Sequence, residues 1–346
     1  MTEKVLVTGG VGFIGSHVAE FYAEKGADVT VLDNLSRENT ARYNWNYLRE
    51  NYAITLIRGD IRNQKKVEEL IRNKDLIVNC AAQVAVTTSI ENPREDFESN
   101  TLGTFNILEG ARNSEKDPTI IHCSTNKVYG ENVNELEVEK KKNRYVFFDK
   151  KYREGIPENF SIDLCEHTPY GCSKLAGDIY MQDYAKLYGL KTGIFRMSCI
   201  YGTRQFGTED QGWLAHFAIS TLQGNPITIY GDGKQVRDVL YITDLLNVYD
   251  LFKENSKKFR GEVFNIGGGR ENTVSLLELL NILEEKIGKR SKITFEDWRP
   301  SDQKVYISDI SKAKKKLNWK PEVSLEQGIS NFINWFQQIA GTYKNE

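Results

Sequence analysis

The 346-residue chain lacks most features that mark a metal-binding, secreted, membrane or nucleic-acid-binding protein. Its five cysteines show no C-x-x-C spacing, which argues against a zinc site or a disulfide framework and is typical of a reducing compartment. With 46 basic and 48 acidic residues the net charge is −2, so no nucleic-acid partner is indicated. No apolar run is long enough to cross a membrane, and no signal peptide is recognised. We therefore expect a cytoplasmic protein without a metal, built as one large or two ordinary domains.

A glycine-rich turn lies near the start of the chain. An apolar β-branched run enters it and a helical pattern follows at once, as VLVTGGVGFIG over residues 5–15. Gly9 allows the turn, Gly12 lets phosphates approach the backbone, and Gly15 lets the helix pack close to the strand. Free N–H groups and the positive end of the helix dipole then face one point, which suits a pyrophosphate. Strand, turn and helix together predict a dinucleotide site.

The second predicted strand, residues 28–33, ends in a carboxylate. Asp33 follows Gly15 by eighteen residues. At that strand end it can accept hydrogen bonds from the adenosine ribose hydroxyls, and it would repel a 2′-phosphate. Arg37 offers a phosphate partner, but Asp33 favours NAD over NADP as the cofactor.

Strand and helix patterns alternate through the first half of the chain, and the strands are nearly continuous apolar runs. This is typical of an α/β fold with a doubly wound parallel Rossmann sheet, whose ligand lies at the carboxyl edge. One long helix is predicted over about 93–112. We expect the NAD-binding domain over residues 1–200, with part of 235–266 returning to it. A smaller mixed α/β substrate-binding domain is expected over 201–346.

Residues at the turn and after the strands are the expected cofactor site. Asp60 and Ile61 follow the third strand, where adenine would lie, and small alanines follow the fourth. The full expected set is Gly9, Gly12, Phe13, Ile14, Gly15, Asp33, Asn34, Asp60, Ile61, Ala81, Ala82, Gln83, Asn100, Ser124, Tyr170 and Lys174.

The predicted chemical centre is the pair Tyr170 and Lys174. The two residues are one helical turn apart, so their side chains share a face. Free tyrosine has a pKa of about 10, and a base working near neutrality needs it lowered by roughly 3 units, about 4 kcal/mol. We expect the Lys174 ammonium and an oxidised nicotinamide to lower it, and Thr125 to orient the reacting hydroxyl. The residues predict reversible hydride transfer between a secondary alcohol and NAD.

The segments TGGVGFIG, STNKVYG and YGCSK, together with Asp33, resemble an extended short-chain dehydrogenase/reductase of the nucleotide-sugar class. The resemblance covers nearly the whole chain. It implies that Arg237 and Arg299 bind the diphosphate of a sugar nucleotide, as forked guanidinium donors suit phosphate oxygens. It also implies a homodimer or a dimer-based tetramer. Cys199 departs from the family, where many members carry a substrate-binding Asn.

Within this class, STNKVYG, YGCSK, GKQVRDVL and the long segment 131–168 resemble the CDP-tyvelose (CDP-paratose) 2-epimerases. The resemblance implies NAD-dependent inversion at C2 of a CDP-sugar, by abstraction and return of a hydride. The other expected substrate-binding positions are Asn126, Gln205, Gln211 and Trp213.

Three alternative functions remain. A UDP-sugar 4-epimerase needs only the tyrosine, lysine and threonine. A 4,6-dehydratase is disfavoured, since dehydratases resemble S-T-D-E-V-Y-G where this chain has Asn126-Lys127, and an amide cannot protonate a leaving hydroxyl. A non-catalytic NAD-binding sensor would need neither the Tyr170–Lys174 pair nor the two arginines.

Overall fold

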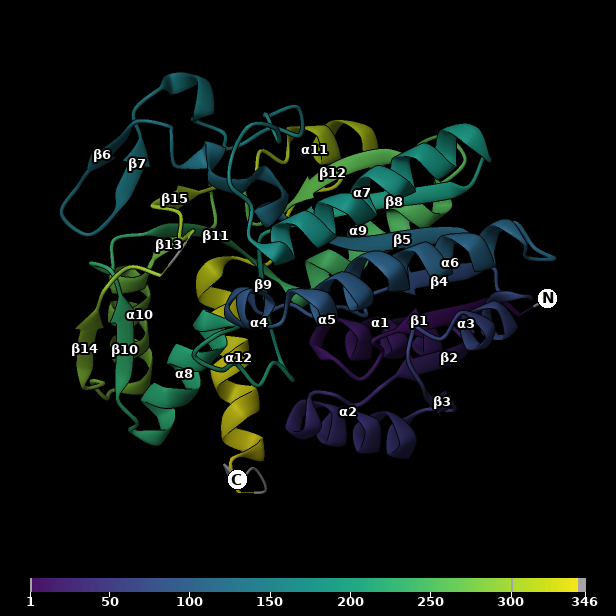
Figure 1. The fold of residues 1–346 in the computed structure, drawn as a ribbon. Helices are drawn as coiled ribbons and strands as arrows, with labels where there is room; N and C mark the ends of the chain where they lie inside the picture. The colour runs from purple at the N-terminus through teal and green to yellow at the C-terminus, as the bar shows by residue number, and fades with distance from the viewer. Residues whose placement is uncertain (1, 300, 342–346) are drawn as a thin grey trace. The chain divides into compact units, whose positions relative to one another are not determined.

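The computed structural model describes residues 2–299 and 301–341, which divide into two compact units (Figure 1). The first unit contains the described residues of 1–128, 167–197 and 246–264. The second contains those of 129–166, 198–245 and 265–346.

A seven-stranded sheet forms the centre of the first unit, in the order β12-β8-β5-β4-β1-β2-β3. The strands are β1 Lys4–Thr8, β2 Asp28–Asp33, β3 Thr55–Arg58, β4 Leu76–Asn79, β5 Thr119–Thr125, β8 Lys191–Met197 and β12 Glu262–Ile266. All neighbours from β8 to β3 pair in parallel. The chain builds outward in both directions from β1 and β4, so the predicted doubly wound parallel fold is confirmed.

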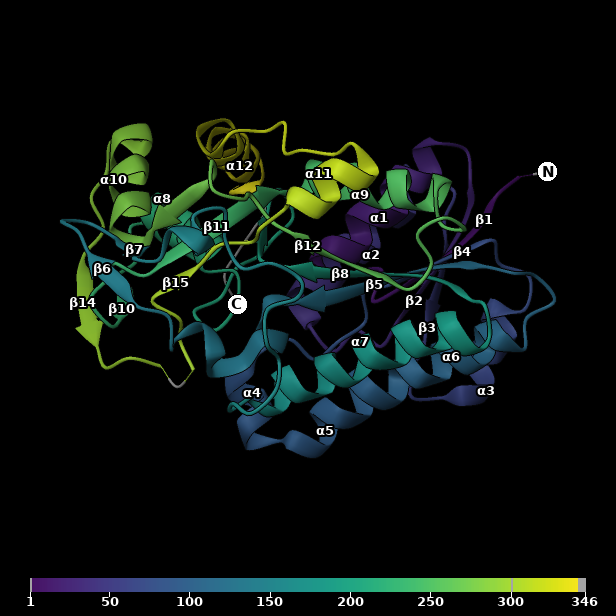
Figure 2. The ribbon, with the colours of Figure 1, turned by 90° about the horizontal axis from the view of Figure 1, so that it is seen from above.

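Helices cover both faces of this sheet, which explains why β4 and β5 are buried along their whole length. Figure 2 shows α3, α6 and α7 on one face and α1 and α9 on the other. Their bounds are α1 Phe13–Glu24, α3 Gln64–Ile71, α6 Gly103–Arg112, α7 Pro169–Leu187 and α9 Ile242–Glu254. No helix in the described part of the chain is long and apolar enough to span a bilayer.

Two helical regions differ from the prediction. The single helix expected over 93–112 is divided into α5 Pro93–Phe97, a π-helical turn η1 Glu98–Leu102, and α6. The π turn carries the buried Asn100, whose amide bonds to α7. The sequence analysis also missed α2, Glu38–Asn51. Its buried residues are only Ala41, Asn44 and Leu48, so its apolar periodicity is sparse. A short helix α4, Val86–Glu91, precedes α5.

The second unit contains a sheet of β13, β11 and β15 with β9 also paired to β11, and a separate parallel pair, β10 and β14. Its strands are β9 Cys199–Tyr201, β10 Ile227–Tyr230, β11 Val236–Tyr241, β13 Thr273–Ser275, β14 Ile293–Glu296 and β15 Val305–Tyr306. Its helices are α8 Trp213–Gln223, α10 Leu276–Ile287, α11 Ser311–Leu317 and α12 Leu325–Ile339. Helix α10 begins with a capping box between Ser275 and Glu278.

Residues 129–166 belong to the second unit, whereas the expected division assigned them to the first. They contain the hairpin of β6 Val138–Lys140 and β7 Tyr145–Phe147, with the 3-10 turns η2 Asn126–Val133 and η3 Lys150–Tyr152 beside it. Arg144 donates twice to the carboxylate of Glu278, at 2.8 and 2.6 Å, and the Tyr145 hydroxyl donates to Asp232 at 2.8 Å. These long-range bonds fix the hairpin to α10 and to the loop between β10 and β11. Residues 246–264 return to the first unit.

Candidate active site

The glycine turn between β1 and α1 has the conformation that a dinucleotide pyrophosphate requires. Gly9 has φ +62, and a Cβ there would lie 2.7 Å from the backbone N and Cα of Ala81. A Cβ on Gly15 would lie 2.2 Å from the carbonyl oxygen of Gly9. Helix α1 starts after Gly12 without a side-chain cap, so its first N–H groups remain for a ligand. Phe13 and Ile14 supply two of these groups.

Asp33, at the end of β2, holds the turn in place. Its Oδ2 accepts the N–H of Val11 at 3.1 Å, and its Oδ1 accepts the N–H of Leu35 at 2.8 Å. Burial raises the pKa of Asp33, and the two backbone hydrogen bonds oppose that change. Each carboxylate oxygen keeps a further lone pair, so the group can still accept a ribose hydroxyl.

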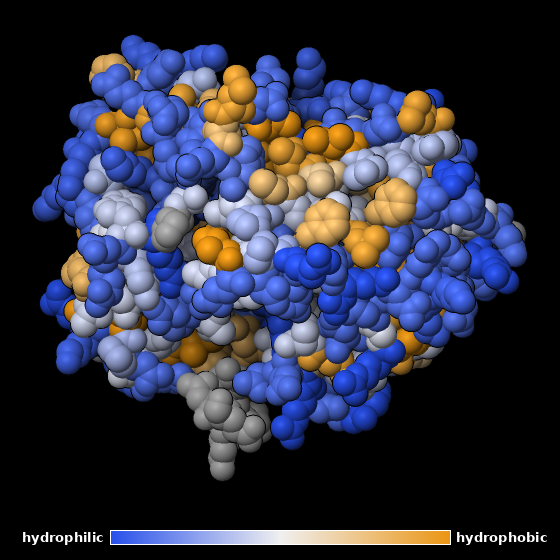
Figure 3. All heavy atoms as spheres, in the orientation of Figure 1, coloured by the Kyte–Doolittle hydropathy of each residue, from blue (hydrophilic) through white to orange (hydrophobic). Residues whose placement is uncertain are grey.

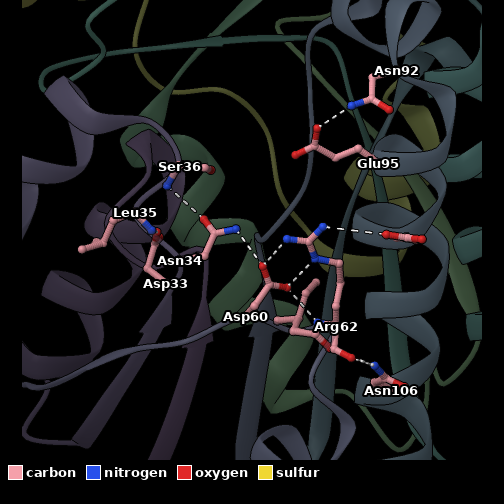
Figure 4. Close-up of polar contacts among 11 residues, drawn as sticks. Asp33, Asn34, Leu35, Ser36, Asp60, Arg62, Asn92, Glu95 and Asn106 are labelled. Carbon is pink, nitrogen blue, oxygen red and sulfur yellow. Dashed lines mark hydrogen bonds and ion pairs between the residues drawn. The ribbon is translucent and has the colours of Figure 1, made fainter.

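Asp60 is already engaged with other side chains (Figure 4). Arg62 donates from Nε to Oδ1 at 3.0 Å and from Nη2 to Oδ2 at 2.7 Å, and Asn34 donates to Oδ2 at 2.9 Å. Burial alone would raise the pKa of Asp60, but these bonds lower it to about 2. The Nδ2 of Asn106 donates to the carbonyl oxygen of Ile61 at 2.9 Å. The loop at the end of β3 is thus held rigid, and adenine contact by Asp60 or Ile61 stays a prediction.

Asn100 connects the loop after β4 to α7. Its Oδ1 accepts the N–H of Gln83 at 2.9 Å, and its Nδ2 donates to the Gln83 carbonyl at 3.0 Å and to Ser173 Oγ at 3.0 Å. Ala81 and Ala82, just before Gln83, are only partly buried. The amide of Asn100 therefore positions the expected cofactor loop, and its own contact with the cofactor remains a prediction.

Tyr170, Thr125 and Lys174 are brought together within the first unit. Tyr170 is in the first turn of α7, where Thr168 caps the helix, and Thr125 is the last residue of β5. All three side chains are buried. Burial raises the pKa of Tyr170 to about 12, while a hydrogen bond with the Thr125 side chain opposes this. Tyr170 and Thr125 are thus in contact, while the catalytic roles of the three residues stay predictions.

The lowering of the Tyr170 pKa by Lys174 together with an oxidised nicotinamide stays a prediction. Lys174 Nζ donates to the carbonyl oxygen of Cys123 at 2.5 Å. The Tyr170 pKa is raised rather than lowered, because desolvation of the phenolate outweighs the favourable groups around it. Burial likewise lowers the pKa of Lys174. Ser124, next to Cys123 in β5, is buried.

Two arginines of the second unit have different environments. Arg237 is buried, donates to the carbonyl oxygen of Gln303 at 2.5 Å, and pairs with Asp302. Arg299 stacks on the ring of Tyr230 at 4.0 Å and lies 3.4 Å from Asp210. The sequence analysis did not identify Tyr230. No local motif marks it, because its contact with Arg299 depends on the pairing of β10 with β14.

The loop before α8 contains two glutamine side-chain oxygens that accept no hydrogen bond from the described residues. Gln205 Oε1 and Gln211 Oε1 are buried and lack a hydrogen-bond partner among the described residues. Trp213, the first residue of α8, donates its indole N–H to the thiol of Cys199 at 3.3 Å. Cys199 stands where many family members resembling this chain carry an asparagine, and in this chain it contacts Trp213. Asn126 is buried, and its Oδ1 accepts the hydroxyl of Thr125 at 3.3 Å.

The turn, the sheet and the Thr125–Tyr170–Lys174 group define an extended short-chain dehydrogenase/reductase. The family model described as GDP-mannose 4,6 dehydratase matches residues 6–332. The chain therefore belongs to this family of nucleotide-sugar epimerases and dehydratases, and it is an enzyme. Within the described residues, no three His, Cys, Asp or Glu side chains form a group that would hold a metal ion.

Individual relatives are similar over their whole length. The chain is 42% identical to CDP-paratose 2-epimerase of Salmonella typhi, over 97% of this chain and 100% of that protein. The crystal structure of UDP-glucose 4-epimerase with UDP-glucose from Thermotoga maritima is 31% identical with a TM-score of 0.81, covering 97% and 99% of the two chains. UDP-glucuronic acid 4-epimerase from Bacillus cereus, solved with UDP-glucuronic acid and NAD, gives 30% identity, the same TM-score and the same coverage.

Proposed function

We propose that this chain is an NAD-dependent isomerase that inverts C2 of a CDP-sugar, of the CDP-paratose to CDP-tyvelose or CDP-glucose to CDP-mannose type. The observation that carries the proposal is the buried Tyr170, hydrogen-bonded to Thr125 one turn from Lys174, in a chain with no acid at 126–127. The 42% identity to a CDP-paratose 2-epimerase supports C2 as the carbon and cytidine as the base.

The residues of the first unit fit NAD. A side chain at Gly9 would collide with the backbone of Ala81, and one at Gly15 with the backbone of Gly9, so glycine is required for the tight turn at the start of α1. Asp33 suits an unphosphorylated ribose. A relative of the same fold is solved as an NAD complex. When bound, NAD accepts a hydride from the sugar carbon and returns it.

Tyr170 is the proposed base and acid. It removes the proton of the C2 hydroxyl as the carbon is oxidised, and returns it to the ketone oxygen as the carbon is reduced from its other face. A pKa of about 12 is too high for a base near neutrality, so positive charge must be added when the cofactor binds. We infer that Lys174 then holds the nicotinamide ribose and faces the phenolate, while Thr125 orients the reacting oxygen.

The residues of the second unit supply groups for the rest of the substrate. Arg237 and Arg299 are the proposed diphosphate ligands. Arg299 pairs with the carboxylates of Asp210 and Glu209 at 3.4 and 3.7 Å, which phosphate oxygens can replace. The Oε1 atoms of Gln205 and Gln211 lack hydrogen-bond donors among the described residues, so they suit hydroxyl groups of the sugar or ribose. Trp213 is proposed to form the adjoining apolar wall.

A UDP-sugar 4-epimerase is the second candidate. The solved 4-epimerases match with a TM-score of 0.81, and that reaction needs only the same three catalytic groups. A 4,6-dehydratase is disfavoured because Asn126, which accepts the Thr125 hydroxyl, cannot protonate a leaving hydroxyl.

We also propose a homodimer, or a tetramer built from dimers, in the cytoplasm. Exposed apolar side chains gather along α7 and the helices beside it, where orange atoms cluster in Figure 3. A patch of this kind on a helical face is typical of a protein interface. The exposed residues are Phe97, Leu102, Ile179, Tyr180, Leu187 and Tyr188.

Proton NMR of the purified protein with CDP-glucose, CDP-paratose or UDP-glucose, without added cofactor, tests the proposal. A change at H2 of a CDP-sugar alone supports it. A change at H4 of UDP-glucose would replace it with 4-epimerisation, and a 4-keto-6-deoxy product would mean that the interpretation of Asn126 is wrong. Protein that carries NAD but turns over none of the three would support a sensor. Tyr170→Phe is the control, because it removes the base and keeps the ring.

A further inference from the structure

Two cysteines lie side by side at the carboxyl ends of neighbouring strands. The register of β4 and β5 pairs Asn79 with His122, so the next residues, Cys80 and Cys123, face each other. Their sulfur atoms are 3.4 Å apart. Neighbouring strands are about 4.8 Å apart, which is within the Cα spacing of roughly 4.4 to 6.8 Å that a disulfide spans. The backbone therefore already has the geometry that a Cys80–Cys123 bond needs.

The surroundings of Cys123 favour its thiolate form, which is the nucleophilic form of a cysteine. The hydrogen bond from Cys80, together with one from the Tyr249 hydroxyl 3.1 Å away, lowers the pKa of Cys123, although burial opposes this. The same hydrogen bond to Cys123 and burial raise the pKa of Cys80. The pair therefore loses its first proton more readily than two isolated thiols would, and the two sulfur atoms share the proton that remains. Cys80 is partly exposed and Cys123 is buried, so we infer that a small reagent reaches Cys123 past Cys80.

We propose that Cys80 and Cys123 are a redox-active dithiol that a hydroperoxide closes into a disulfide beside Lys174. The Cys123 thiolate attacks one oxygen of hydrogen peroxide, the O–O bond breaks, and a sulfenic acid forms while hydroxide leaves and takes up the proton that the Cys123 thiol released, giving water. The Cys80 sulfur then attacks the Cys123 sulfur, the S–O bond breaks, and a second water leaves with the remaining proton. Two thiols lose two electrons and two protons, and one hydrogen peroxide becomes two waters.

Formation of the Cys80–Cys123 disulfide would act directly on Lys174, the proposed catalytic lysine. The sulfur atoms must move from 3.4 Å to about 2.05 Å apart, which shifts the Cys123 side chain on the residue whose carbonyl oxygen accepts Lys174 Nζ. It also removes the thiolate charge that favours the ammonium form of Lys174. We therefore expect oxidation to lower turnover at least tenfold, and dithiothreitol to restore it. The effect on turnover rests on the proposed function, whereas bond formation does not.

The test treats the full-length protein with hydrogen peroxide, removes the peroxide with catalase, and alkylates the denatured protein before peptide mass spectrometry. We expect a Cys80–Cys123 crosslinked peptide and the loss of two of the five thiols. Cys80→Ser and Cys123→Ser should each abolish the crosslink, and Cys172→Ser, at an exposed cysteine, should not. Oxidation of Cys123 only to sulfinic acid, or a crosslink to another cysteine, would overturn the proposal.

Activity provides the second measurement. Wild-type protein should lose turnover with peroxide and regain it with dithiothreitol, whereas Cys123→Ser, which lacks the attacking thiolate, should keep its turnover under the same treatment. Equal loss in Cys123→Ser would refute the link to Lys174. A protein that forms the crosslink but turns over no sugar nucleotide would instead contradict the proposed function and leave the dithiol established.

Discussion

Replacing Gly9 by alanine tests whether the turn between β1 and α1 is shaped for NAD. At φ +62 an L side chain costs about 1–2 kcal/mol. The new Cβ would also lie 2.7 Å from the Ala81 backbone, closer than real Cβ contacts come. Overpacking of this kind costs about 1–3 kcal/mol. We expect Gly9→Ala to reduce the free energy of unfolding by about 2–5 kcal/mol.

Gly26 provides a matched control in the same unit. It has φ +81, and a Cβ there would meet nothing within 4 Å. Gly26→Ala therefore carries the left-handed strain without the overlap, and should lose only about 1–2 kcal/mol. The difference between the two variants isolates the contact with Ala81.

Urea unfolding followed by circular dichroism, with NAD affinity measured by calorimetry, checks both variants. A displaced turn should weaken NAD binding at least tenfold in Gly9→Ala, about 1.4 kcal/mol, and leave Gly26→Ala near wild type. If Gly9→Ala lost no more stability than Gly26→Ala and bound NAD as tightly as wild type, our account of the turn would be refuted.

Three further predictions concern single side chains. Tyr170→Phe should reduce turnover at least a hundredfold without a change in the urea midpoint, because it removes the proposed base and keeps the buried ring; turnover within tenfold of wild type would exclude Tyr170 as that base. Asp60→Asn should lower stability by about 1 kcal/mol at pH 7, since Arg62 and Asn34 hold the Asp60 pKa near 2 and the group is partly exposed. This contribution is present above about pH 4 and is lost as the pH falls toward 2, so wild type and variant should converge there; a constant gap down to pH 2 would contradict it. Arg299→Ala should raise KM for the sugar nucleotide at least tenfold with a smaller effect on kcat, measured by the NMR assay, whereas an unchanged KM would remove Arg299 from the substrate site.

The sequence by itself determined the features that depend on near neighbours in the chain. The glycine spacing over 9–15 dictates a turn because only glycine fits its φ and its close approach to Ala81. Tyr170 and Lys174 are four positions apart, so any helix there places them on one face. Apolar runs without alternation made a buried parallel sheet predictable, and that prediction is confirmed.

Contacts between distant residues were decided only by the tertiary structure. The bond from Lys174 to the Cys123 carbonyl and the burial that raises the pKa of Tyr170 depend on how α7 packs on β5. Segment 129–166 joins the second unit through bonds such as Arg144 to Glu278, 134 residues apart. Register and packing bring such residues together, and no local pattern carries that information.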